Sequence, residues 1–253
     1  MIITLSKLIT KIKEKNKINN IWYLLLLFVI IAVPILLVVK QPDYGTAMVM
    51  LAVFFALIFT AGISLWYIFG AATIFAVSFP FLYIYILPEH AKDRINVFLN
   101  PQSDPLGAGY NIIQSMLAVG SGQVWGMGLF NGNQTQLGYL PMKTTDFIFS
   151  VISEEMGFVF SVITIVLFIL LIVRTFYIAK NAKDSFGTLL ASGIGMMFFA
   201  HFLENVGMTI GLMPITGIPL PFVSYGGSSM LTNCMAVGIL ISINRARKRK
   251  MFE

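Results

Sequence analysis

The stretch IWYLLLLFVIIAVPILLVV, from Ile21 to Val39, carries no charged residue and is almost entirely apolar. A helix of about 20 apolar residues crosses the hydrocarbon core of a bilayer, so this stretch predicts a membrane-spanning helix. Uncharged stretches recur at residues 46–88, 156–173, 185–203 and 205–244. The two longest could each hold two passes, or one pass and a re-entrant loop. We therefore expect an all-α polytopic membrane protein.

Composition supports this class. The chain has 253 residues, of which 57% are hydrophobic and 11% charged, with a mean hydropathy of +0.84. A soluble domain has roughly 25% charged residues. The single cysteine, Cys234, excludes a disulfide within the chain and is typical of a buried packing thiol. The sequence has no HExxH, paired CxxC, P-loop or GxSxG motif, which argues against the common soluble hydrolase and nucleotide chemistries.

The apolar pattern predicts about six spanning helices, at residues 21–39, 46–63, 66–87, 147–173, 187–210 and 223–243. With six passes, most of the 17 Lys and Arg residues fall on the side of the two termini, and only Lys40, Lys92, Arg94 and Lys143 fall opposite. The positive-inside rule then places both termini in the cytoplasm. The net charge of +6 thus reflects topology, and we expect no nucleic-acid partner.

These assignments divide the chain into five segments. Residues 1–20 form a basic segment whose apolar residues recur at helical spacing, as in an amphipathic interfacial helix. Residues 21–87 hold three spanning helices, and residues 146–244 hold three more. Between them, residues 88–145 form one large extracellular loop, rich in Gly and Asn, which we expect to be an ordered cap with short helices. Residues 245–253 form a basic cytoplasmic tail.

Four charged residues gather where the fourth span is expected to begin: Lys143, Asp146, Glu154 and Glu155. Asp146 precedes the apolar run and allows two interpretations: a capping residue, or a carboxylate at the membrane edge that faces a cavity. Ser150 and Ser153 share its helix face, and Glu154 lies roughly 12 Å deeper along the axis. A polar stripe inside a membrane is costly unless it faces water or a partner, so this stripe predicts a polar groove. Glu155 points elsewhere, which favours a hydrogen bond between helices.

The segment NVGMTIGLMPITGIPLPFVSYGGSSMLTN, from Asn205 to Asn233, interrupts the last apolar block with three prolines. It fits a re-entrant loop whose serines cap the last helix. It also fits a cradle for pyrophosphate or glycan, formed by backbone N–H groups around Ser228 and Ser229. Irregular backbone at membrane depth is tolerated only where it is buried or lines a cavity.

Two further sites each allow two interpretations. Asp43, in QPDYGTA, is either the N-cap of the second span or a functional carboxylate. His201 and Glu204 are three residues apart on one helix, beside Asn205. Two residues are weak evidence for a metal, so we favour hydrogen bonding inside the bundle and assign no metal ligands. The sequence leaves open whether a divalent cation takes part as a cofactor.

Three stretches together resemble the SEDS family of polytopic peptidoglycan glycosyltransferases, represented by RodA, FtsW and SpoVE. They are QPDYGT from Gln41, GSGQVWGMGLFNGNQTQLGYLPMKTTDFIFSVISEEMGF from Gly120, and the segment that begins at Asn205. NGNQTQLGYLP is similar to the elongation branch, which serves cell shape, more than to the cell-division branch. The family has about ten helices, so the resemblance implies that the chain corresponds to the C-terminal part of that fold, without the N-terminal part.

The resemblance also implies a function in peptidoglycan biosynthesis at the bacterial cell membrane. The substrate would be lipid II, and Asp146 would be the general base for glycan polymerisation. Lys143, Glu154, Ser228, Ser229 and Asp43 would be candidates for contact with the substrate. The expected partners are a class B penicillin-binding protein transpeptidase and membrane lipids. Two alternatives stay open: an inactive remnant that only docks a partner, and a transporter that flips a lipid-linked sugar.

Overall fold

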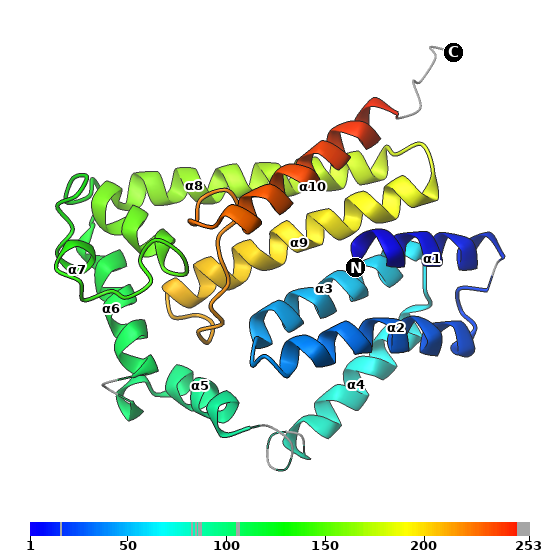
Figure 1. Cartoon of the computed structure of the whole chain (residues 1–253), viewed down its shortest axis with the longest axis horizontal. Coiled ribbons are helices and arrows are strands. Elements are labelled where there is room, and N and C mark those ends of the chain that lie inside the picture. The colour runs from blue at the N-terminus through cyan, green and yellow to red at the C-terminus, as the bar shows by residue number, and fades with distance from the viewer. Residues whose placement is uncertain (16, 82, 84, 86–87, 105–106, 247–253) are drawn as a thin grey trace. The chain divides into compact units, whose positions relative to one another are not determined.

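A computed structural model describes residues 1–15, 17–81, 83, 85, 88–104 and 107–246 (Figure 1). Within these ranges all regular structure is helical. The longer helices are α1 (Ile2–Glu14), α2 (Ile21–Val39), α3 (Tyr44–Ala61), α4 (Leu65–Phe81), α5 (Glu89–Leu99), α6 (Ala108–Ser121), α8 (Ile148–Lys180), α9 (Ser185–Thr209) and α10 (Gly227–Arg245). Two shorter elements are the 3-10 helix η2 (Pro101–Ser103) and α7 (Asn133–Gln136). The all-α prediction is confirmed.

Five helices, α2, α3, α8, α9 and α10, are long and apolar enough to cross a membrane. They match five of the six predicted spans. The sixth, predicted at residues 66–87, corresponds to α4, which has 17 residues. The rest of that prediction falls partly on residues 82, 84, 86 and 87, which lie outside the described residues, as do residues 247–253 of the predicted basic tail.

The chain divides into two compact units. The first comprises Met1–Ile68, Ile169–Ala200 and Ser228–Glu253, and the second comprises Phe69–Phe168 and His201–Gly227.

In the first unit, α1 packs on α3, and so does α2. Leu5, Ile9 and Ile12 of α1 are buried, whereas its lysines are exposed. The predicted amphipathic helix is therefore present, but other helices of the unit cover its apolar stripe, including α9, where Gly193 lies close to Ile2. Its placement in the cytoplasm stays a prediction.

The helix ends of the first unit follow from local hydrogen bonds. The Asn20 side chain accepts the Trp22 N–H at the start of α2, and Asp43 Oδ1 accepts the Thr46 N–H at 3.0 Å at the start of α3. Each side chain satisfies one of the backbone donors that a helix N-terminus leaves unpaired. Asp43 is thus an N-cap in this structure.

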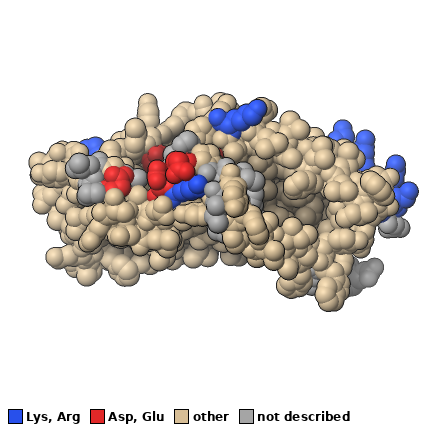
Figure 2. Space-filling view, turned by 90° about the horizontal axis from the view of Figure 1, so that it is seen from below, with Lys and Arg blue, Asp and Glu red and all other residues tan. Residues whose placement is uncertain are grey.

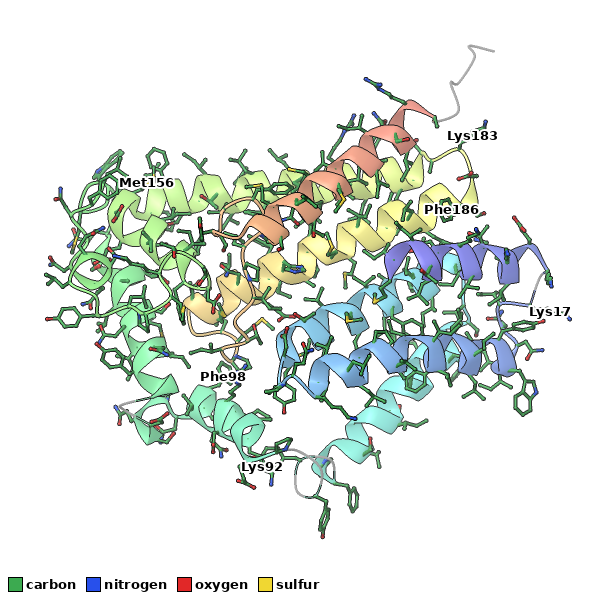
Figure 3. The ribbon with its side chains drawn as sticks, in the orientation of Figure 1. Lys17, Lys92, Phe98, Met156, Lys183 and Phe186 are labelled. Atoms are coloured by element: carbon green, nitrogen blue, oxygen red, sulfur yellow. The ribbon has the colours of Figure 1, made fainter. Side chains whose placement is uncertain are left out.

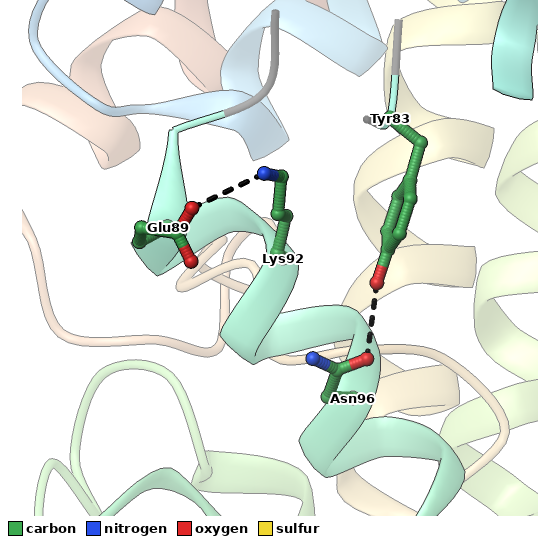
Figure 4. Close-up of polar contacts among 4 residues, drawn as sticks. All are labelled: Tyr83, Glu89, Lys92 and Asn96. Carbon is green, nitrogen blue, oxygen red and sulfur yellow. Dashed lines mark hydrogen bonds and ion pairs between the residues drawn. The ribbon is translucent and has the colours of Figure 1, made fainter. Parts of the chain in front are cut away.

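The second unit contains the predicted cap between α4 and α8. The expected short helices are confirmed as α5, α6, α7 and η2. The start of α5 is anchored by an ion pair between Lys92 Nζ and Glu89 Oε1 at 3.1 Å, and Tyr83 donates its hydroxyl to Asn96 Oδ1 at 3.1 Å (Figure 4). Arg94, on the same helix, donates to the Ile215 carbonyl at 3.1 Å and so holds the segment that follows α9.

Charged side chains are sparse on the surface. The face in Figure 2 is formed mostly by uncharged residues, with Asp, Glu, Lys and Arg in a few small groups. Large apolar side chains are exposed along α2 and α8, among them Phe28, Leu36, Leu167 and Leu170. Such a surface is typical of a protein whose helices face lipid.

Candidate active site

Asp146 lies in a tight turn directly before α8, which begins at Ile148. The carbonyl of Met142 accepts the N–H groups of Thr145, Asp146 and Phe147 at 3.1, 3.1 and 3.3 Å. Among the described residues, no backbone N–H of α8 donates to the Asp146 carboxylate. The carboxylate therefore does not cap α8 in this structure, and the capping interpretation does not explain it.

Three successive backbone carbonyls around Asp146 are each held by a donor from residues 205–225. The Thr144 carbonyl accepts from Tyr225 N at 2.9 Å, that of Thr145 from Ser224 Oγ at 2.6 Å, and that of Asp146 from Asn205 Nδ2 at 2.8 Å. Because one donor is a backbone N–H group and the other two are side chains held by further hydrogen bonds, the turn has little freedom to move. We call these three bonds the carbonyl clamp.

The donors of the carbonyl clamp are themselves fixed. Ser224 Oγ accepts the Leu220 N–H at 2.7 Å, and Asn205 Nδ2 also donates to the Ile218 carbonyl at 2.7 Å. Asn205 is fully buried. Since both of its N–H groups face carbonyls, only one orientation of its side-chain amide satisfies the geometry. Asn205 thus links α9, the turn before α8 and the proline-containing segment.

Phe147 and Phe149, the residues before and after Ile148 in the sequence, anchor the turn. Phe147 packs in one buried cluster and Phe149 in another. The first cluster contains Ala118 and Leu140, and the second contains Phe168, Val206 and Leu220. Burial of one large aromatic side chain stabilises a protein by roughly 1.5–3 kcal/mol. The two aromatic anchors therefore hold Asp146 at a defined position before α8.

The Asp146 carboxylate is partly buried beside Gly217. A Cβ atom on Gly217 would lie 3.4 Å from Asp146 Oδ2, and Gly217 has a φ of +76° that L-residues rarely adopt. Burial raises the pKa of Asp146, and a hydrogen bond from the Thr145 side chain opposes this rise. A carboxylate with a raised pKa is a stronger base than an exposed one once it is ionised.

Lys143 and Glu154 meet at α7. Lys143 Nζ donates to the Thr135 carbonyl at 2.5 Å. Glu154 is fully buried, and its two carboxylate oxygens accept the N–H groups of Gln134 and Thr135 at 2.7 and 3.0 Å. Glu154 thus holds the first turn of α7. The side chain of Glu155 accepts from Gln136 Nε2 at 2.8 Å, so its partner also comes from α7 and not from a spanning helix.

The predicted polar stripe on α8 is present, but protein groups occupy it. The hydroxyls of Ser150 and Ser115 lie 2.7 Å apart, and Ser115 also donates to the Thr209 carbonyl at 2.8 Å. Ser153 donates to the Phe149 carbonyl at 2.9 Å. The stripe therefore ties α8 to α6 and α9 within the second unit.

α8 is broken at Gly157, whose φ of 76° and ψ of −173° are not helical. The loop at residues 122–128 enters this break. The carbonyls of Glu154 and Glu155 accept the N–H groups of Met127 and Gly128, both at 2.9 Å. In return, Phe158 N and Val159 N donate to the carbonyls of Gln123 and Val124 at 2.8 and 3.3 Å. The loop thus replaces the hydrogen bonds that the helix loses. Met156, labelled in Figure 3, directly precedes the break.

The six residues predicted for the site divide between the two units. Lys143, Asp146 and Glu154 belong to the second unit, where Lys143 and Glu154 share Thr135 as a partner. Asp43, Ser228 and Ser229 belong to the first unit. Ser228 and Ser229 lie in the first turn of α10, where Ser228 is exposed and Ser229 Oγ is 3.4 Å from Asn233 Nδ2.

Several residues of the site had no predicted role. Ser224 and Gly217 were not singled out, and Asn205 was considered only as a neighbour of Glu204. A signal for Asn205 was present, since it is a polar residue in a largely apolar helix and must find a hydrogen-bond partner there. The described residues include no cluster of three His, Cys, Asp or Glu side chains that could hold a metal ion.

Comparison with known proteins identifies the family. The sequence model of the cell cycle protein family of FtsW, RodA and SpoVE matches residues 1–249. The chain belongs to this family. The resemblance that the three motifs indicated is therefore confirmed over almost the whole chain.

Two relatives in the FtsW/RodA/SpoVE family have names that state an activity. Peptidoglycan glycosyltransferase MrdB of Escherichia coli (strain K12) is 42% identical over 221 residues, which are 87% of this chain and 60% of that protein. Peptidoglycan glycosyltransferase RodA of Treponema pallidum is 52% identical over 159 residues, which are 63% of this chain and 37% of that protein. The chain thus spans about 60% of the length of MrdB.

A solved structure supports the fold assignment. It describes the structural coordination of polymerization and crosslinking by a peptidoglycan synthase complex. Its matching chain is 28% identical, with a TM-score of 0.80, and the match covers 98% of this chain and 69% of that one. The polytopic helical architecture is therefore that of a family member.

Proposed function

We propose that this chain carries the glycosyl-transfer centre of a peptidoglycan glycosyltransferase that polymerises lipid II. The observation that carries the proposal is the Asp146 carboxylate: it caps none of the described helices, yet the carbonyl clamp and two buried aromatic anchors hold its backbone. Family relatives named peptidoglycan glycosyltransferases support the reaction class.

In the proposed reaction, Asp146 is the general base. Its ionised carboxylate accepts the proton of the 4-hydroxyl group of the acceptor sugar. The hydroxyl oxygen then attacks the anomeric carbon of the donor sugar and forms the new glycosidic bond. The bond between that carbon and the lipid pyrophosphate breaks, and the pyrophosphate leaves with the electron pair. A positioned general base contributes about 10²- to 10⁴-fold to such a step.

The leaving pyrophosphate requires positive charge or N–H donors. Lys143 precedes Asp146 by three residues, and its ammonium group contacts a carbonyl. Within the described part of the chain, no ion pair forms between Lys143 and a carboxylate. We assign Lys143 to the phosphate groups. The first turn of α10, with Ser228 and Ser229, stays a separate candidate for contact with phosphate or glycan.

Glu154 and Asp43 take supporting roles in this proposal. Each carboxylate accepts backbone N–H groups at the start of a helix, Glu154 at α7 and Asp43 at α3. These bonds occupy both oxygens of Glu154 and the Oδ1 oxygen of Asp43. We therefore assign them to positioning the substrate-binding segments.

The proposal places the protein in the bacterial plasma membrane with both termini in the cytoplasm, since the distribution of Lys and Arg favours this orientation. We further propose a class B penicillin-binding protein as partner. The related structure of a complex that coordinates polymerization and crosslinking supports this assignment.

The test is polymerisation of lipid II by the purified chain together with a cognate class B penicillin-binding protein. Glycan strands are expected from the unaltered chain and not from Asp146→Ala. A longer family member serves as a positive control for the substrate. If strands form equally with Asp146→Ala, the assignment of Asp146 is wrong. If the control is active and the chain forms no strands, these 253 residues do not suffice for glycosyl transfer.

A further inference from the structure

The loop at residues 122–130 presents a large apolar surface. Trp125 is 81% exposed and Phe130 is 79% exposed, and Val124 and Leu129 are also exposed. The surrounding sequence, residues 105–142, contains no Asp, Glu, Lys or Arg. A water-exposed loop of this length would carry several charges, since soluble domains have roughly 25% charged residues. Composition and exposure thus both indicate that this loop does not face bulk water.

The position of the loop relative to α8 is fixed by backbone contacts. Four hydrogen bonds join residues 123–128 to the two sides of the break at Gly157. The contact is so close that a Cβ atom on Gly157 would lie 2.3 Å from the Gly126 nitrogen. The loop and the break at Gly157 therefore lie at the same depth in the membrane.

The character of α8 changes at the break. Ser150, Ser153, Glu154 and Glu155, which precede it, are buried. From Phe158 to Val173, the exposed side chains are apolar, among them Phe158, Leu167, Leu170 and Val173. Residues 158–177 would span roughly 30 Å at 1.5 Å per residue, which is the thickness of a hydrocarbon core. The far end of this span carries Arg174, whose guanidinium lies 5.1 Å from the ring centroid of Tyr177. Interfaces are enriched in such residues.

We propose that the 122–130 loop docks on the lipid bilayer, with Trp125, Leu129 and Phe130 in the interfacial region of the leaflet at the amino-terminal end of α8. The lipid-facing side of α8 begins at Phe158, whose backbone is hydrogen-bonded to the loop, so the apolar surface of the loop is continuous with it. Trp is enriched at this depth because its ring is apolar and its N–H is polar. This inference is independent of the proposed reaction.

The chain's own tryptophans allow a direct test. The other two, Trp22 and Trp66, are 75% and 84% exposed, so replacing both with Phe should preserve the fold and leave Trp125 as the single emitter. The full chain would be reconstituted into nanodiscs whose lipids carry bromine either near the headgroup end or deep in the acyl chains. Quenching of Trp125 fluorescence by each lipid, and by aqueous iodide, is then measured.

The reference is a variant with all three tryptophans changed to Phe and a new one introduced by Gln102→Trp, at an exposed position of η2. We expect Trp125 to be quenched most by shallow bromine and several-fold less by iodide than the Gln102→Trp reference. A second probe, Phe130→Trp in the variant that lacks the three natural tryptophans, should show the same quenching pattern. It tests the loop at another position, so the result does not depend on Trp125 alone. Iodide quenching equal to the reference would overturn the proposal, because the loop would then be in water. Strongest quenching by deep bromine would also overturn it, because the loop would lie in the hydrocarbon core.

Discussion

Asn205 donates its side-chain amide to the backbone carbonyl of Asp146 at 2.8 Å, across 59 residues of sequence. The same nitrogen donates to the Ile218 carbonyl at 2.7 Å. One buried side chain thus fixes both the turn that carries the candidate base and the segment that lies beside its carboxylate. The relationship makes Asn205 a positioning residue, since it touches the backbone of Asp146 and not a reacting group.

Asn205→Ala should therefore reduce polymerisation more than it reduces substrate binding. The buried Ile218 carbonyl and the partly buried Asp146 carbonyl lose their donor, and an unsatisfied buried group costs about 1–3 kcal/mol in stability. A displacement of about 1 Å at a reacting group can cost 10²-fold in rate, so we expect kcat to fall about tenfold to a hundredfold with KM changed little. Steady-state kinetics with lipid II and thermal unfolding in detergent would measure both effects.

The matched control is Thr209→Val on the same helix. Thr209 is fully buried, and its hydroxyl donates to the Val206 carbonyl at 2.8 Å, away from Asp146. Thr209→Val should lower the stability of the protein but leave kcat unchanged. Equal kcat values for the unaltered chain and Asn205→Ala would mean that the clamp does not position the base.

The raised pKa of Asp146 predicts how the rate depends on pH. A general base must be ionised, so the rate should fall as the pH decreases through the pKa of Asp146, and this fall should begin at a higher pH than for an ordinary Asp. The profile of kcat/KM against pH reports this pKa. A rate that stays constant below the usual range of an Asp pKa would contradict the prediction.

The raised pKa of Asp146 also predicts how the stability of the protein depends on pH. The pKa of Asp146 is higher in the folded than in the unfolded state. The contribution of the protonated carboxyl group to the free energy of unfolding is therefore present below the unfolded-state pKa and is lost as the pH rises through the folded-state pKa. At neutral pH the ionised Asp146 therefore costs stability. Asp146→Asn should be at least as stable as the unaltered chain at pH 7, and the difference should shrink in acid. Thermal unfolding at several pH values would measure it, and a loss of stability at pH 7 would contradict the sign.

Lys143→Gln should weaken the interaction with the lipid pyrophosphate. The amide keeps a donor for the Thr135 carbonyl but removes the positive charge. We expect KM for lipid II to rise several-fold and the dependence of KM on salt to weaken, because screening acts on the charge that was removed. Lys183→Gln, in the connection between α8 and α9, is the control for a general loss of positive charge. Identical KM values and salt dependence for Lys143→Gln and the unaltered chain would exclude the assignment.

Gly157→Ala should destabilise the protein strongly. The φ and ψ angles of Gly157 lie in a region that is almost restricted to glycine, and a Cβ atom there would meet the Gly126 nitrogen at 2.3 Å. Backbone strain and overpacking each cost roughly 1–3 kcal/mol. Gly120→Ala, at a helical position of α6 with no atom within 4 Å, is the control and should be neutral or slightly stabilising. Similar unfolding temperatures for both variants would show that the loop does not pack into the break as described.

The helices could be predicted well because uncharged apolar stretches leave a chain few alternatives in a membrane. The range of α2 matches the predicted range of residues 21–39, and α3 begins at Tyr44, two residues earlier than predicted, because Asp43 caps it. α8 extends to Lys180, beyond the predicted end at residue 173. Arg174 lies inside α8, and its side chain lies over the Tyr177 ring. A charge ends the apolar pattern without ending the helix.

The site was less predictable from the sequence. Asp146 could be singled out, because a carboxylate directly before an apolar helix needs an explanation. The carbonyl clamp could not be predicted, because backbone carbonyls are present at every residue and carry no pattern. The entry of the loop at residues 122–128 into α8 depends on backbone bonds and on glycines, so Gly122, Gly126 and Gly157 mark it in the sequence. The role of Glu154 depends on α7, four residues long, which no periodicity indicates.

The most direct measurement compares the unaltered chain with Asp146→Asn in single-turnover polymerisation of saturating lipid II. The substitution keeps the shape and removes the basic carboxylate, so the carbonyl clamp should persist. We predict a rate at least about 100-fold lower with lipid II binding unchanged, as expected for the loss of a general base. A rate within a few-fold of the unaltered chain would contradict the central claim, because Asp146 would then not accept the proton.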